Sequence, residues 1–315
     1  MIRPAVLCPL DFSESSRTSL QYAGALAGHF ASRLTLLAVN DPLLGEAAEL
    51  SGGPTHLVED TVREMEKCFR ETFEDKPEGL EDVRLEVALG KPAPEILRIS
   101  REQACDLIVM GSHGATGFRK LFFGSTTERV LRETAVPVLV TPPGSAPRTR
   151  DDVRKVVRRI LAPVDLTAAT PRQLSIVGAI AQALDVPLVV LHVIEPVRSM
   201  VSTQARVPKI EAERRYRAER ELEQAIEALP KSHAEGLVAY GEPAEEIAKV
   251  AQDRDTGLIV MGLHSSPLLG PRMGSVTYRV LCLAHRLVLA LPPHSASARQ
   301  MDLSSTPESA KEPVR

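Results

Sequence analysis

Short apolar runs alternate with longer amphipathic segments along the first half of the chain. The apolar runs lie at residues 6–10, 34–39, 85–89, 107–110 and 136–140, and most are rich in β-branched residues, as is typical of strands. The segments at 15–30, 61–73, 94–102 and 125–133 carry the apolar spacing and end signals of helices. This alternation predicts a parallel, doubly wound α/β sheet, buried on both faces.

The second half of the chain repeats the first. "AVLCPLDFSESS" is echoed by "RILAPVDLTAAT", "TLLAVNDP" by "VVLHVIEP", "GKPAPEIL" by "GEPAEEIA", "DLIVMGSHG" by "GLIVMGLHS" and "FGSTTERVL" by "MGSVTYRVL". The offset falls only from 154 residues (Asp11 and Asp165) to 150 residues (Ser125 and Ser275). We therefore predict a tandem duplication: domain 1 at residues 1–143 (copy 1), a linker at 144–156, domain 2 at 157–293 (copy 2), and a disordered tail at 294–315.

Length and composition narrow the class of protein. The chain has 315 residues, enough for two domains, with 43% apolar residues, 25% charged residues and a formal net charge of -3. This charge gives no reason to expect nucleic acid or an anionic membrane as a partner, and the absence of Trp argues against stacking on single strands. Four scattered cysteines without a Cys-x-x-Cys pair, and no apolar run of membrane-spanning length, favour a soluble protein with reduced thiols in the cytoplasm.

A glycine-rich segment follows the fourth predicted strand. It reads "GSHGATGFRKLFFGSTT", with the spacing G-x2-G-x9-G-S formed by Gly111, Gly114, Gly124 and Ser125. Ligands of doubly wound sheets bind beyond the carboxyl ends of the strands, and glycine lets the backbone turn and approach a ligand closely. A helix that starts at Ser125 offers unpaired N–H groups and a positive dipole end to an anion. The pattern indicates a site for a phosphate chain.

These motifs resemble the ATP-binding branch of the universal stress protein family. The resemblance covers nearly the whole chain and implies two tandem Rossmann-like domains, each with a five-stranded parallel sheet. It implies ATP as the cofactor, with or without Mg²⁺. The residues that it places at the nucleotide are Asp11 and Val39 at the adenosine end, Met110, Gly111, His113 and Gly114 at the ribose and phosphate turn, and Gly124, Ser125, Thr126 and Thr127 at the phosphates.

The resemblance also bears on assembly and on the second site. It implies that the copies pair through their last strands as an intramolecular pseudo-dimer, which can dimerise again. In copy 2 a Ser (Ser265) stands where copy 1 has Gly114, and two prolines, Pro267 and Pro271, remove amide donors from the loop. Asp165, Val193, Gly262, Gly274 and Ser275 are kept. We expect one tightly bound ATP per chain, in copy 1.

Other interpretations remain open. Asp11 can cap the helix near Ser13 instead of meeting a nucleotide, and His113 can be a solvated turn residue. The leading hypothesis is a stress-response protein that binds ATP and acts through conformation or partners, with no catalytic residue and no metal site of its own. The alternatives are a slow ATPase or autophosphorylating enzyme that uses Ser125, Thr126 or Thr127 as acceptor, and a nucleotide-free scaffold. Binding is favoured because no general base and no acidic metal pair accompanies the loop.

Overall fold

The computed structural model describes residues 4–43, 56–73, 77, 79–112, 124–144, 155–196, 207–229, 234–263, 265–266, 270–271 and 274–293. In copy 1 the strands are β1 (Ala5–Leu10), β2 (Arg33–Asn40), β3 (Val83–Leu89), β4 (Leu107–Gly111) and β5 (Val138–Thr141). Its helices are α1 (Glu14–His29), α3 (Leu57–Thr72), α4 (Pro92–Glu102) and α5 (Ser125–Glu133). Strands and helices alternate as the sequence predicts.

Copy 2 repeats this order. Its strands are β6 (Ile160–Pro163), β7 (Leu188–Ile194), β8 (Ala234–Tyr240), β9 (Leu258–Gly262) and β12 (Leu287–Leu291). Its helices are α7 (Thr170–Leu184), α8 (Val207–Glu227), α9 (Pro243–Asp253) and α10 (Ser275–Leu283). Between β9 and α10 the chain forms a small antiparallel pair, β10 (Ser265–Ser266) and β11 (Gly270–Pro271), which the sequence reading did not predict.

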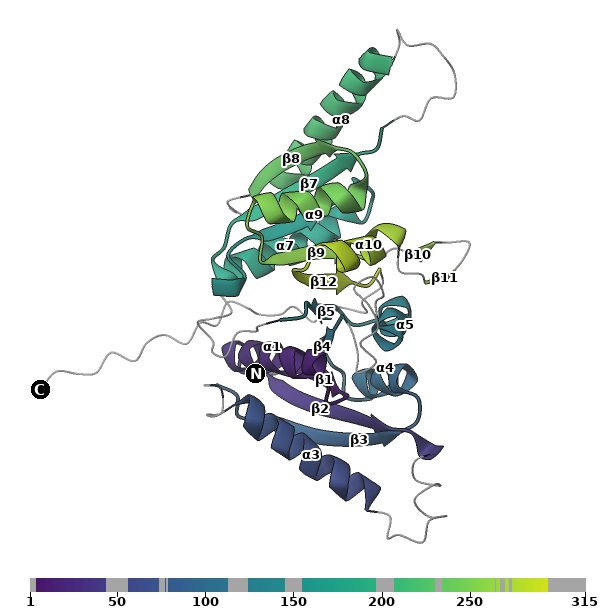
Figure 1. The fold of residues 1–315 in the computed structure, drawn as a ribbon. Coiled ribbons are helices and arrows are strands. Elements are labelled where there is room, and N and C mark those ends of the chain that lie inside the picture. The colour runs from purple at the N-terminus through teal and green to yellow at the C-terminus, as the bar shows by residue number, and fades with distance from the viewer. Residues whose placement is uncertain are drawn as a thin grey trace, which may run out of the picture.

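The two copies share one continuous sheet of ten strands (Figure 1), in the order β3-β2-β1-β4-β5-β12-β9-β6-β7-β8. All neighbours within a copy run parallel. The copies meet where β12 runs antiparallel to β5, with Leu289 opposite Leu139. The predicted pairing of the two copies through their last strands is present, and it removes two sheet edges from solvent.

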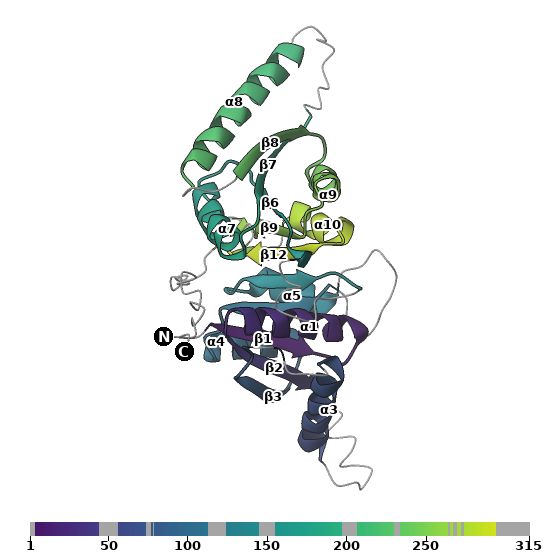
Figure 2. The same cartoon turned by 90° about the vertical axis from the view of Figure 1, so that its left-hand side faces the viewer.

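Helices cover both faces of this sheet. One buried cluster joins β-strand side chains to α1, α3, α7 and α8, and a second joins the opposite side chains to α4, α5, α9 and α10. Figure 2 shows the two layers clearly in copy 2, with α7 and α8 on one side and α9 and α10 on the other. Successive residues of β1 alternate between the layers: Cys8 lies in the first cluster and Leu7 in the second.

Several element boundaries differ from the prediction by one to four residues, and α3 and β5 are two examples. Helix α3 begins at Leu57, one turn earlier than predicted, although its N-cap residue His56 makes no side-chain cap. Strand β5 begins at Val138, two residues later than predicted. The hydroxyl of Thr134 accepts from the Val136 amide at 2.9 Å and donates to its carbonyl at 2.7 Å, so that this segment forms a turn and not a strand.

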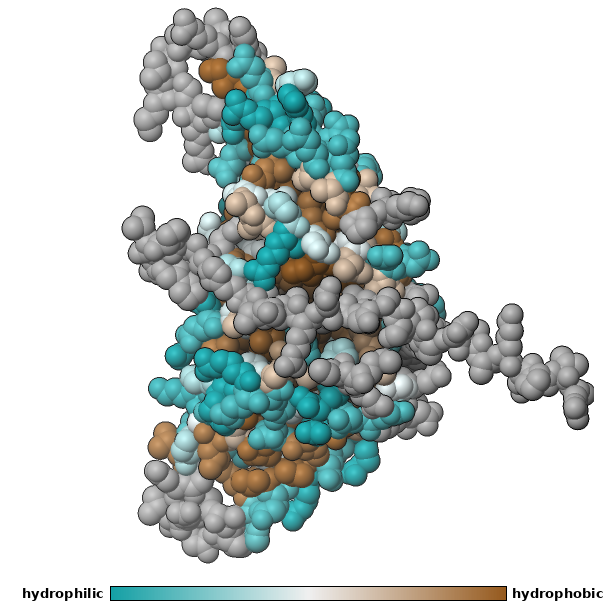
Figure 3. All heavy atoms as spheres, turned by 180° about the vertical axis from the view of Figure 1, so that it is seen from behind, coloured by the Kyte–Doolittle hydropathy of each residue, from teal (hydrophilic) through white to brown (hydrophobic). Residues whose placement is uncertain are grey.

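The surface differs between the two ends of the molecule. The upper end of the view in Figure 3, formed by α8, is mostly hydrophilic, whereas hydrophobic residues are visible at the lower end near α3 and β3. Leu43 and Leu89 are among the exposed large apolar side chains of copy 1. None of the helices in the described ranges is both long enough and apolar enough to cross a bilayer. The predicted tail and most of the predicted linker lie outside the described residues.

Candidate functional site

The centre of the copy 1 sheet is a topological switch point. Strand β1 pairs with β2 on one side and with β4 on the other, so the chain connections diverge between β1 and β4. Doubly wound sheets bind ligands in the crevice at such a point, beyond the carboxyl ends of the strands. Asp11 directly follows β1, and Gly111 is the last residue of β4. The sheet thus brings these two predicted site residues to the same edge.

Asp11 is exposed and is held in place by Ser13. Its Oδ1 accepts hydrogen bonds from the Ser13 amide at 3.1 Å and from the Ser13 hydroxyl at 2.5 Å. Between them Phe12 adopts a left-handed backbone conformation, with φ of 62°. The N-cap of α1 is Ser13, whose Oγ accepts from the Ser16 amide at 3.2 Å. Ser13, and not Asp11, therefore caps helix α1, and Asp11 holds the Ser13 side chain by accepting its hydrogen bond.

The end of β4 is tied to the start of α5 by two hydrogen bonds. Thr127 is buried, and its hydroxyl donates to the Gly111 carbonyl at 2.8 Å. The Gly124 amide donates to the Ser112 carbonyl at 2.9 Å, and the Ser112 amide in turn donates to Thr141 at 3.1 Å. These contacts fix where the chain leaves the sheet and where it returns, and the sequence reading missed the part that Ser112 plays in them.

The N-terminus of α5 has no side-chain cap. Gly124 occupies the N-cap position with an extended backbone, and the first intrahelical bond runs from Glu128 to the Gly124 carbonyl at 2.8 Å. The amides of Ser125, Thr126 and Thr127 precede this bond, so they have no partner within the helix. At α1, by contrast, a Ser side chain meets an equivalent amide. The α5 N-terminus therefore presents donors of the kind that bind anions.

The other predicted site residues of copy 1 differ in how far their side chains are exposed to solvent. Ser125 is exposed and Thr126 half-buried, whereas the Met110 side chain packs in the second buried cluster and leaves only its backbone for a ligand. Val39, near the end of β2, is half-buried and packs against that cluster. His113 and Gly114 lie outside the described residues.

Copy 2 reproduces the hydrogen-bonded turn that follows the first strand. Oδ1 of Asp165 accepts from the Thr167 amide at 3.1 Å and from its hydroxyl at 2.7 Å, as Asp11 does with Ser13. The bond from Thr277 to the Gly262 carbonyl is longer, at 3.4 Å. Helix α10 also begins after a glycine without a side-chain cap. In the loop before it, part of the backbone is paired in the β10–β11 ladder.

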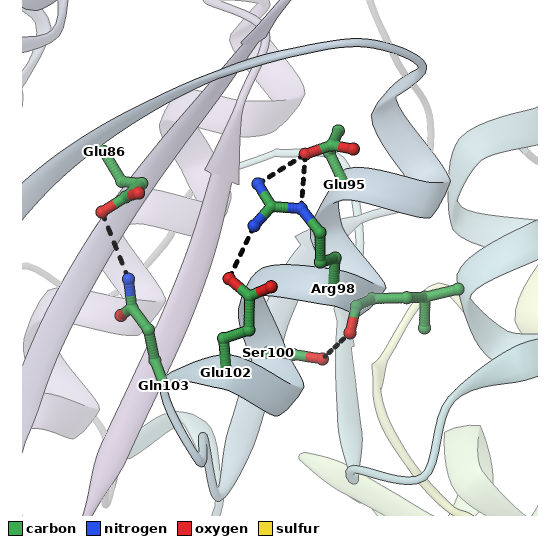
Figure 4. A network of polar contacts seen from close by, with 7 residues as sticks. Glu86, Glu95, Arg98, Ser100, Glu102 and Gln103 are labelled. Carbon is green, nitrogen blue, oxygen red and sulfur yellow. Dashed lines mark hydrogen bonds and ion pairs between the residues drawn. The ribbon is translucent and has the colours of Figure 1, made fainter.

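Charged and polar side chains at α4 are engaged in ion pairs and hydrogen bonds with one another and with β3. On α4, Arg98 pairs with Glu95 at 2.7 Å and Glu102 at 2.6 Å, while Gln103 reaches Glu86 on β3 (Figure 4). These hydrogen bonds raise the pKa of Arg98 above its ordinary value, and the exposed pairs contribute little to stability. All four cysteines are free, and no group of side chains in the described ranges has the composition of a metal site.

The comparisons with known proteins agree with this architecture. Residues 3–142 and 157–292 each match the model of the universal stress protein family. The chain therefore belongs to the universal stress protein family, a family associated with the stress response, and carries two tandem domains. Universal stress protein MJ0577 of Methanocaldococcus jannaschii is 33% identical over 154 residues, which cover 43% of this chain and 92% of that protein. Universal stress protein YxiE of Bacillus subtilis is 28% identical over 142 residues, covering 43% and 96%.

One solved structure matches this fold over nearly the whole chain. A universal stress protein from Archaeoglobus fulgidus matches with a TM-score of 0.60 at 20% identity, over 91% of this chain and 96% of that chain. Another universal stress protein, crystallised in complex with cAMP, is 19% identical over 46% of this chain and 100% of its own, with a TM-score of 0.34.

Proposed function

We propose that copy 1 binds ATP at the edge of the sheet between β1 and β4, and that the protein acts through nucleotide-dependent conformation or partner binding. The observation that carries the proposal is the uncapped start of α5, fixed beside the carboxyl end of β4 by the Thr127–Gly111 hydrogen bond. A phosphate chain supplies the acceptors that the amides of Ser125 and Thr126 lack within the helix. Glu128, the acidic residue of this turn, is neutralised by Arg132.

The adenosine end of the ligand is assigned to Asp11 and Val39. The Asp11 carboxylate is a hydrogen-bond acceptor, which suits the hydroxyls of a ribose, and Ser13 orients it at the switch point. Val39 reaches the same edge because β2 pairs with β1, Ala38 lying opposite Leu10. An acceptor at one end of the crevice and amide donors at the other match the chemistry of a nucleotide.

The three hydroxyl residues of α5 take different roles in this proposal. Ser125 and Thr126 contact phosphate, since neither is buried. Thr127 positions the turn, because its hydroxyl hydrogen is already donated to Gly111. For the alternative of an autophosphorylating enzyme, the exposed Ser125 is then the acceptor that the geometry favours.

Copy 2 is proposed to bind nucleotide weakly or not at all. Its β10–β11 ladder pairs Ser265 with Pro271 and Ser266 with Gly270, at the place where copy 1 carries Gly114 and its following loop. Backbone that is committed to a ladder is not available to cradle a phosphate chain. The proposed weakness of copy 2 thus rests on this ladder and on Ser265 in place of Gly114, while the Asp165 turn is kept.

Mass spectrometry of the full chain, purified without added nucleotide, tests the function. Retained ATP supports binding without turnover, and retained ADP supports the slow ATPase. A chain that carries no nucleotide and gains none when ATP is added supports the scaffold and contradicts the proposal. Phosphate covalently attached at Ser125 would favour the autophosphorylating enzyme.

A further inference from the structure

A second cleft lies in copy 2, between the carboxyl ends of β6 and β7 and helix α8. Its volume is about 220 Å³. Leu166, Ile194 and Ala218 give it an apolar lining, and charged side chains from α8 border it. The copy 2 counterparts of the glycine motif, Gly262, Gly274 and Ser275, do not line this cleft, whereas Asp165, the counterpart of Asp11, does. The cleft therefore lies beside the adenosine end of the copy 2 crevice and lacks the residues of its phosphate end.

One polar group of the lining has a defined tautomer. His192 Nδ1 lies 2.9 Å from the Val164 carbonyl oxygen. A carbonyl can only accept, so Nδ1 carries the hydrogen and Nε2 is the ring nitrogen left for a ligand. His192 therefore presents Nε2 to the cleft as an acceptor.

Two arginines of α8, Arg214 and Arg217, border the cleft and differ in their hydrogen bonding. Arg214 donates to the Glu195 carbonyl at 2.9 Å, which anchors its guanidinium. Arg217 and Glu221, one helical turn apart, make no ion pair or hydrogen bond within the described part of the chain. Arg215, between the two arginines, pairs instead with Glu219 at 2.6 Å and does not line the cleft.

Copy 1 differs at two of the positions that line this cleft. Asn40 occupies the position that corresponds to Ile194, and its side-chain amide donates to Thr61 of α3 at 2.9 Å. Ala38 stands where copy 2 has His192. The repeated fold thus carries a polar bridge between strand and helix in one copy and a charged cleft in the other.

We propose that this cleft, hereafter the α8 cleft, binds a small organic monoanion through a carboxylate that contacts Arg217, while its hydrocarbon part lies on Leu166, Ile194 and Ala218 beside His192. Guanidinium groups bind carboxylates well because their donors match the two oxygens. Asp165 and Glu221 offset the charges of the two arginines, so the cleft lacks the excess positive charge that a polyanion such as a nucleoside triphosphate needs. A phosphate ester, with a charge of about -1.5 to -2 at neutral pH, is disfavoured for the same reason.

Nuclear magnetic resonance of the full chain with isotope-labelled histidine tests the α8 cleft. Benzoate is the probe, benzamide is its neutral isostere, and His192→Gln assigns the His192 signals. We expect benzoate to shift these signals saturably, with a Kd of about 1 mM, as a small ligand with one charged contact gives. Benzamide is expected to bind at least about fivefold more weakly, which is the part of affinity that the charge supplies.

Two matched variants separate the α8 cleft from general surface effects. Arg217→Gln is expected to raise the Kd for benzoate at least about fivefold. Arg215→Gln, two residues away and paired with Glu219, is expected to leave it unchanged. Equal effects of the two variants, equal binding of benzamide and benzoate, or the absence of a saturable shift would each overturn the proposal.

Discussion

Thr127 and Gly111 are joined by a hydrogen bond of 2.8 Å from the threonine hydroxyl to the glycine carbonyl, although sixteen residues separate them. The bond is buried and connects the first turn of α5 to the last residue of β4. It sets the distance between the helix start that offers amides and the strand end that forms the crevice. The proposed phosphate site therefore depends on a residue that does not itself contact phosphate.

Replacing this hydroxyl should weaken both the fold and the site. Thr127→Val keeps the shape but leaves the Gly111 carbonyl without its donor, which costs about 1–2 kcal/mol of unfolding free energy. Denaturant titration measures this loss, and ATP affinity should fall with it. Thr277→Val is the matched control, since its bond to Gly262 is longer, at 3.4 Å, and its effect should be smaller. A larger loss in Thr277→Val would contradict this account.

The junction of the copies can be tested by dividing the chain. Leu139 and Leu289 face each other across the antiparallel pair of β5 and β12, and both strands are buried. Separate fragments of residues 1–143 and 157–293, mixed at micromolar concentration, should sediment as a complex because each exposes an apolar edge strand. Fragments that remain monomeric in analytical ultracentrifugation would show that the pairing needs the covalent connection.

Gly257 should be intolerant of any side chain. A Cβ at this position would lie 1.8 Å from the Val156 carbonyl oxygen, and both partners are backbone. We expect Gly257→Ala to lower the unfolding free energy by more than about 2 kcal/mol, measured by denaturant titration. Gly178→Ala in α7 is the control: its Cβ meets only the end of Leu229, at 3.3 Å, and helix propensity favours alanine by about 0.5–1 kcal/mol. Similar effects of the two variants would contradict the packing described here.

Buried thiols should make the fold sensitive to alkali. Burial raises the pKa of the Cys105 thiol from about 9 to about 11. The folded state therefore keeps a proton that the unfolded state loses, and the stabilisation is present below pH 9 and lost as the pH rises to 11. Over this range the unfolding free energy of the native chain should fall faster than that of Cys105→Ala, by about 1.4 kcal/mol per pH unit. If the unfolding free energies of the two proteins changed with pH in parallel, the Cys105 thiol would not have a raised pKa in the folded state.

Much of the fold could be predicted from the sequence because it rests on local patterns. The apolar runs and their spacing determine strands and helices, and the return of "DLIVMG" as "GLIVMG" and of "FGSTTERVL" as "MGSVTYRVL" indicates two copies. The start of α3 at Leu57 was missed because His56 gives no capping signal. The ladder of β10 and β11 was missed because its strands are only two residues long.

The roles of individual side chains at the candidate site could not be predicted from the sequence, because they depend on contacts between residues that are distant in the chain. Ser125, Thr126 and Thr127 look alike as a run of hydroxyls, and only the helix rotation places Thr127 inside and Ser125 outside. Asp11 and Ser13 are both good caps, and the geometry decides that Ser13 is the cap. The α8 cleft depends on an exchange of Asn40 for Ile194 between copies, together with the position of a separate helix.

The most direct test of the ATP site is calorimetric titration of the full chain and two glycine variants with ATP. Gly124 and Gly274 both have extended backbone angles that valine also adopts, so neither variant should lose the fold by circular dichroism. Gly124→Val places a side chain where phosphate approaches α5 and should weaken binding at least about tenfold, a loss of about 1.4 kcal/mol. The account predicts one tight site per chain that is lost in Gly124→Val and kept in Gly274→Val. Two equivalent sites, or unchanged affinity in Gly124→Val, would contradict it.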